Sequence, residues 1–104
     1  MTYRSLYVQE HPDEASATAP YLFANQAPVF CWLNAQTWPA PAWAFAREHD
    51  LHVDYVDNCW MLVALNGSML KRFLRAGQAA DPNVSAILER VQEDRWYVIN
   101  EEEF

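Results

Sequence analysis

Two apolar runs separated by only two residues constrain the fold of this chain more than any other feature. The runs are Leu51–Val56 and Cys59–Leu65, and Asp57-Asn58 lies between them. Asp and Asn adopt a positive φ more readily than most residues, as the tightest hairpin turns require. The spacing therefore predicts a β-hairpin over 51–65 with a two-residue turn.

A two-residue turn fixes the register of this hairpin. It pairs Val56 with Cys59 and Tyr55 with Trp60, and the residues further from the turn pair in the same order. One face is then apolar throughout and is expected to pack on the core: Leu51, Val53, Tyr55, Trp60, Leu62 and Ala64. The opposite face carries the polar side chains and is expected to meet solvent: His52, Asp54, Val56, Cys59, Met61 and Val63.

The remaining elements follow from hydrophobic periodicity and from capping residues. Strands are predicted at 2–9, 29–33 and 95–100, and helices at 38–49, at 68–77 and from 81 onward, with a short helix at 20–25. The apolar run 29–33 is typical of a strand buried on both faces. If it pairs with the strand at 51–56, the intervening helix makes a parallel strand–helix–strand unit.

The predicted fold class is therefore α+β, with mixed α/β as the alternative. It has a single sheet of about four to five strands with helices packed on it. At 104 residues, of which 52% are hydrophobic, the chain has the size and composition of one globular domain, 1–104. The last four residues, Glu101, Glu102, Glu103 and Phe104, are expected to form a solvated acidic tail, since adjacent like charges repel.

Charge narrows the classes of partner. Fourteen acidic residues against seven basic ones give a formal net charge of −7, which argues against binding to nucleic acid or to an anionic membrane surface and favours a basic partner. No apolar run has the length of a membrane span and no signal peptide is visible, so a cytoplasmic protein is expected. In that compartment Cys31 and Cys59 are expected to be free, buried thiols.

The densest group of chemically capable side chains is His52, Asp54 and Cys59, which the predicted register places on one strand face. A small ligand-binding domain or enzyme using this face is the alternative function. However, the sequence shows no metal-ligand spacing, phosphate loop or nucleophile motif. We therefore expect no metal, no cofactor and no enzymatic activity.

The profile of a compact, acidic, aromatic-rich domain favours a protein-binding module. By analogy with bacterial immunity proteins and similar inhibitors, we expect it to sequester a protein partner, with aromatic anchors and carboxylates at the interface. The expected contact residues are Trp38, Glu48, Asp50, Asp54, Asp57 and Phe104. A homo-oligomeric structural protein that uses an open sheet edge is the further alternative.

Overall fold

The computed structural model describes residues 4–19, 26–34, 38, 40–77 and 82–103. The strands are β1 (Arg4–His11), β2 (Val29–Asn34), β3 (His52–Tyr55), β4 (Trp60–Asn66) and β5 (Trp96–Glu103). The helices are α1 (Glu14–Ala17), α3 (Ala42–Glu48), α4 (Gly67–Gly77) and α5 (Val84–Arg90). Within these residues, none of the helices is long and apolar enough to cross a membrane.

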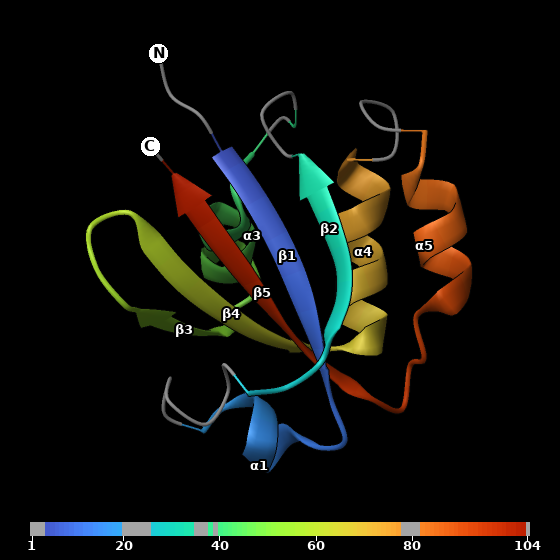
Figure 1. Ribbon diagram of the computed structural model, residues 1–104, viewed down its shortest axis with the longest axis horizontal. Coiled ribbons are helices and arrows are strands. Elements are labelled where there is room, and N and C mark those ends of the chain that lie inside the picture. Colours follow the sequence, from blue (N-terminus) through green and yellow to red (C-terminus); the bar gives the residue numbers. More distant parts are fainter. Residues whose placement is uncertain (1–3, 20–25, 35–37, 39, 78–81, 104) are drawn as a thin grey trace.

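The five strands form one sheet in the order β2-β1-β5-β4-β3, and every neighbouring pair is antiparallel (Figure 1). The α+β fold with helices packed on a single sheet is thus confirmed. The parallel strand–helix–strand unit is wrong, because β2 and β3 lie at opposite edges of the sheet. β1 and β5, the first and last strands of the described chain, pair with each other in the centre of the sheet. They therefore separate β2 from β3.

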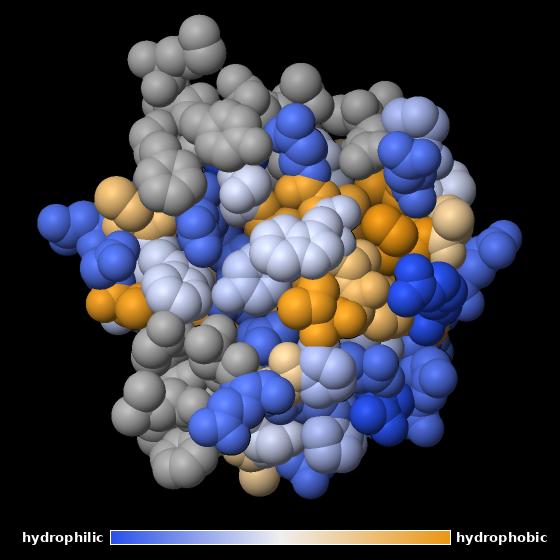
Figure 2. All heavy atoms as spheres, in the orientation of Figure 1, coloured by the Kyte–Doolittle hydropathy of each residue, from blue (hydrophilic) through white to orange (hydrophobic). Residues whose placement is uncertain are grey.

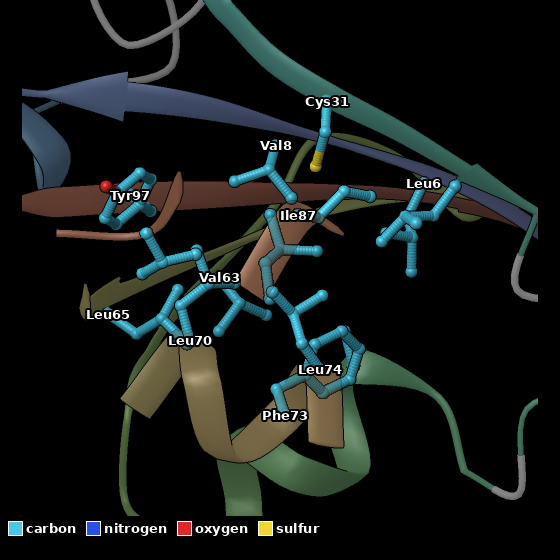
Figure 3. Close-up of a cluster of buried hydrophobic side chains, with 14 of the residues drawn as sticks. Leu6, Val8, Cys31, Val63, Leu65, Leu70, Phe73, Leu74, Ile87 and Tyr97 are labelled. Atoms are coloured by element: carbon cyan, nitrogen blue, oxygen red, sulfur yellow. The ribbon is translucent and has the colours of Figure 1, made fainter. Parts of the chain in front are cut away.

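The main core lies between the sheet and the helices α3, α4 and α5. Figure 3 shows side chains from both layers meeting there, among them Leu6, Val63 and Tyr97 from the sheet and Leu70 and Phe73 from α4. A smaller cluster lies on the opposite face of the sheet, where α1 covers part of it: Ala17, Leu62, Ala64 and Val98. Because both faces of the central strands are covered, their alternating residues are buried on either side.

The apolar run 29–33 predicted a strand that is buried on both faces, and this prediction is wrong. It forms the edge strand β2, in which Cys31 and Leu33 are buried while Trp32 is 68% exposed. Trp32 lies opposite Tyr7 of β1, on the face away from the three packed helices. The alternation along β2 is that of an edge strand with one covered face.

The hairpin at 51–65 is present, but its predicted register is wrong by one residue. Tyr55 pairs with Met61 rather than with Trp60, and Asp54 pairs with Leu62. A two-residue hairpin turn needs a positive φ at a central residue. Among the described non-glycine residues only Asp50 has a positive φ, so Asp57 and Asn58 do not form such a turn. The turn therefore takes a longer path, in which the N–H groups of Val56 and Asp57 both donate to the carbonyl of Trp60.

The prediction of a solvated acidic tail is also wrong for Glu101, Glu102 and Glu103, the tail residues that the structure describes. β5 continues to Glu103, between β1 and β4, and Glu101 is only 1% exposed. Phe104 lies outside the described residues. A run of glutamates has low strand propensity, but pairing on both sides in the centre of the sheet overrides it here.

Three of the predicted helices are present, with small differences at their ends. α4 begins at Gly67, and the side chain of Asn66 rather than Ser68 accepts the N–H of Met69. Gly77, the last residue of α4, does not have the positive φ that glycine often adopts where a helix ends. The short helix predicted at 20–25 lies outside the described residues, and α1 forms just before it, capped by Asp13.

Candidate protein-binding surface at the β3 edge of the sheet

A tight helix ending brings acidic side chains to the start of β3. Asp50 adopts a φ of 53°, and the N–H of Leu51 donates to the carbonyl of Ala46 at 2.8 Å. This is the hydrogen bond of a Schellman ending, with Asp in the position that glycine usually takes. It turns the chain from α3 directly into β3, so the exposed side chains of Glu48 and Asp50 lie at this edge.

β3 is an edge strand with an exposed aromatic residue. It pairs with β4 on one side, and within the described residues no strand pairs with its other side. Tyr55 is 66% exposed, and Asp54 and Asp57 lie close to it along the chain. Tyr is one of the residue types that are enriched among the anchors of protein interfaces.

Four carboxylates and no Lys or Arg occur between Arg47 and Lys71. With Tyr55, these carboxylates define the surface that we call the acidic edge: Glu48, Asp50, Asp54, Tyr55 and Asp57. The edge therefore combines one aromatic side chain with a local excess of negative charge. Such a surface attracts cationic side chains through both its carboxylates and its ring.

Two further hydrogen bonds hold the turn that ends the acidic edge in place. Oδ1 of Asp57 accepts the N–H of Cys59 at 2.7 Å, and the carbonyl of Cys59 accepts the N–H of Glu103 at 2.8 Å. The second bond ties the turn to the end of the central strand β5. Because the turn is fixed, Asp57 is presented to solvent in a defined position.

The expected face of His52, Asp54 and Cys59 does not form. His52 and Asp54 share a face with Ala64 and Leu62, while Cys59 lies in the turn before β4. Nε2 of His52 is 3.4 Å from Oδ2 of Asp54, and the two side chains are 46% and 42% exposed. A contact of this length between solvated groups orients the imidazole only weakly.

The described residues contain neither a pocket beside this pair nor a cluster of three His, Cys, Asp or Glu side chains suited to a metal ion. Both cysteines are free, but Cys59 is exposed rather than buried as expected. Burial raises the pKa of the Cys31 thiol to about 11. Cys31 is therefore protonated at neutral pH and is not an activated nucleophile.

Trp38 is not a surface residue, which corrects its assignment as a contact. It is only 4% exposed, and its ring lies 5.1 Å from that of Phe73 in α4. Its carbonyl accepts a hydrogen bond from Arg4 at 3.0 Å. A Trp next to a proline is typical of a loop, and the sequence alone could not show that this loop residue fills a space beside α4.

The buried carboxylate of Glu101 contacts the start of α3, the helix that leads into the acidic edge. Oε2 of Glu101 accepts the N–H of Ala42 at 2.8 Å, at the first residue of α3, where no side chain of the N-cap residue does so. Burial raises the pKa of Glu101, partly opposed by this hydrogen bond and by the charge of Arg4. Glu101 thus fixes α3, and with it the start of the acidic edge, to the central strand.

Two exposed aromatic residues, Tyr55 and Trp32, were missed by sequence reasoning. Tyr55 lies on the same face of β3 as Val53, which packs against the main core, but its position at the end of an edge strand leaves it exposed. Trp32 was assigned to the core because of the continuous apolar run, although the alternation of Cys31 and Leu33 with Trp32 and Asn34 is compatible with an edge strand. Of the expected contact residues, Asp54 lies in the edge strand β3, Asp50 and Asp57 lie shortly before and after this strand, and Glu48 is the last residue of α3.

Comparisons with models of protein families, with curated proteins and with solved structures gave no match.

Proposed function

We propose that this chain is a small protein-binding module that sequesters a basic protein partner at its acidic edge, as an inhibitor or immunity-type protein in the cytoplasm. The observation that carries the proposal is Tyr55, which is 66% exposed on an edge strand between carboxylates.

The physical roles of the two kinds of side chain differ. The carboxylates attract a positively charged partner over a distance of about a Debye length, roughly 8–10 Å at physiological salt, and so speed association. Tyr55 contributes apolar contact area and a hydroxyl group that can hydrogen-bond, and so slows dissociation. Because the carboxylates stay at the rim, forming the complex does not require their full desolvation.

The unpaired side of β3 supports the same proposal. An edge strand presents backbone N–H and C=O groups to which an extended partner segment can hydrogen-bond. A partner strand rich in Lys and Arg could therefore pair with β3 while its side chains meet Asp54 and Asp57. This arrangement gives both affinity from the backbone and selectivity from charge.

The test is affinity capture from the source cells with two charge-matched variants. Asp54→Asn/Asp57→Asn removes two charges from the acidic edge, whereas Glu89→Gln/Glu93→Gln removes two from exposed positions on and after α5. We expect wild type and the second variant to recover the same partner in stoichiometric amount. The first variant, and Tyr55→Ala, should lose it.

The result that would contradict the proposal is a partner recovered equally well by Asp54→Asn/Asp57→Asn and by wild type. Failure to recover any stoichiometric partner at low salt would contradict it too. Raising the salt concentration should weaken capture by wild type, because screening removes the attraction between exposed charges.

A further inference from the structure

The opposite edge of the sheet carries a surface of different chemistry, centred on β2. Val29 is 46% and Trp32 is 68% exposed there, and both are among the large hydrophobic side chains that the described chain leaves most exposed. The ring of Trp32 packs against that of Tyr7, with centroids 4.6 Å apart. Figure 2 shows hydrophobic colour gathered over β2 and toward α5.

The strand β2 carries no acidic residue, although the chain as a whole is strongly acidic. The sequence has no charged residue from Ala15 to Ala46, which includes all of β2. A positive charge lies beside β2: the guanidinium of Arg90 in α5 lies 4.8 Å from the ring of Phe30 and donates to the carbonyl of Phe30 at 3.2 Å. Two copies of a chain with a net charge of −7 repel each other, and a surface without carboxylates is where they can approach.

The two sheet edges also differ in how they resist pairing. Proteins protect exposed edge strands by making them short, by placing charged residues on them, or by covering them. β3 is protected from pairing with a second acidic copy in the first two ways, since it has four residues and carries Asp54. β2 has six residues and no charged side chain, and the guanidinium of Arg90 occupies only the carbonyl of Phe30, near its start.

We propose that two copies of this chain associate by antiparallel pairing of β2 with β2 of the second copy, about a two-fold axis at Trp32. An axis perpendicular to the sheet places Trp32 directly opposite its own counterpart, at the separation of a cross-strand pair. In this register Phe30 lies opposite Asn34 of the second copy, so the guanidinium of Arg90 must leave the carbonyl of Phe30 when the strands pair. The result is one continuous sheet, in which the two acidic edges lie at the far ends and remain free.

The dimer does not depend on the proposed function, and the two are distinguished by their opposite responses to salt. Screening weakens the repulsion between two acidic copies, so the dimer should become tighter as salt is raised. Binding of a basic partner at the acidic edge should become weaker under the same change. Either proposal can therefore fail while the other holds.

The experiment is sedimentation equilibrium of the full chain at concentrations from about 1 μM to about 1 mM, where weak dimers form. Trp32→Lys introduces a charge at the axis, and Tyr55→Lys makes the matched change at the other edge. We expect wild type and Tyr55→Lys to dimerise, and Trp32→Lys to dimerise at least about tenfold more weakly, as loss of a central Trp contact does at interfaces. Asn34→Lys, a second exposed position of β2, should also weaken the dimer if Trp32→Lys does not fold.

The inference would be overturned by a wild type that stays monomeric up to about 1 mM. A dimer that Tyr55→Lys disrupts while both β2 variants leave it unchanged would overturn it as well. So would a dimer that weakens as salt is raised.

Discussion

At the scale of single residues, Gly77 shows how closely this core is packed. A Cβ atom at Gly77 would lie too close to the ring atoms of Trp38, and Trp38 itself is buried against Phe73. We predict that Gly77→Ala lowers the free energy of unfolding by about 1–3 kcal/mol, the usual cost of overpacking, although alanine favours a helix. Urea denaturation measures this loss.

The control for this prediction is the same substitution in a Trp38→Phe background. A smaller ring leaves room for the added methyl group, so Gly77→Ala should then be less destabilising than in wild type. Equal losses in the two backgrounds would show that Trp38 does not cause the strain.

Glu101 gives a second residue-scale prediction, in which pH is the variable. Burial raises its pKa, so between the unfolded and folded pKa values the folded chain binds more protons than the unfolded chain. Stability from this group is therefore highest below its ordinary pKa and falls as pH rises through the folded value. Glu101→Gln keeps an oxygen for the N–H of Ala42 and removes the charge, so its melting temperature relative to wild type should increase from pH 4 to pH 8.

The exposed variant Glu89→Gln serves as the control for Glu101→Gln. It should show no comparable change with pH. If the difference between Glu101→Gln and wild type is constant over this range, Glu101 is not a buried carboxylate with a raised pKa.

At the scale of elements, the end of β5 supports both the sheet and α3. We predict that deleting residues 101–104 abolishes cooperative folding, because it removes part of the central strand and the carboxylate that accepts the N–H of Ala42. Near-UV circular dichroism and thermal unfolding would show the loss. The full-length variant Glu102→Gln/Glu103→Gln, which removes charge but keeps the strand, should still fold; a truncated chain that melts like wild type would contradict the prediction.

The same elements show what could be predicted from the sequence. The hairpin, the helix over Ala42–Glu48 and the strand that begins at Trp96 follow from local patterns, since periodicity and capping act within a few residues. The register depended on backbone φ at Asp57 and Asn58, and the burial of Glu101 depended on partners far along the chain. For the acidic edge, the sequence placed four carboxylates in and around β3, but it did not indicate that Tyr55 is exposed, because that exposure follows from its position at the end of an edge strand.

At the scale of the whole molecule, the sheet cannot be completed until distant parts of the chain meet. β1 pairs with β5 along its whole length, from Arg4 with Glu103 to His11 with Trp96. Figure 1 shows the start of β1 and the end of β5 side by side as a consequence. Closing so long a loop lowers chain entropy before the contacts that offset it form, which is the condition for slow folding.

Joining the two ends should therefore stabilise the protein mainly by speeding folding. In a backbone-cyclised chain with a short Gly/Ser linker, β1 and β5 stay near each other when the chain is unfolded. The entropy model gives an upper limit of about 5 kcal/mol for a loop of roughly 100 residues. Stopped-flow measurements should show a faster folding rate and a nearly unchanged unfolding rate, relative to a linear chain that carries the same linker. A folding rate that cyclisation leaves unchanged would mean that β1 and β5 pair only after the rate-limiting step, so that another part of the sheet, such as the β3–β4 hairpin, forms first.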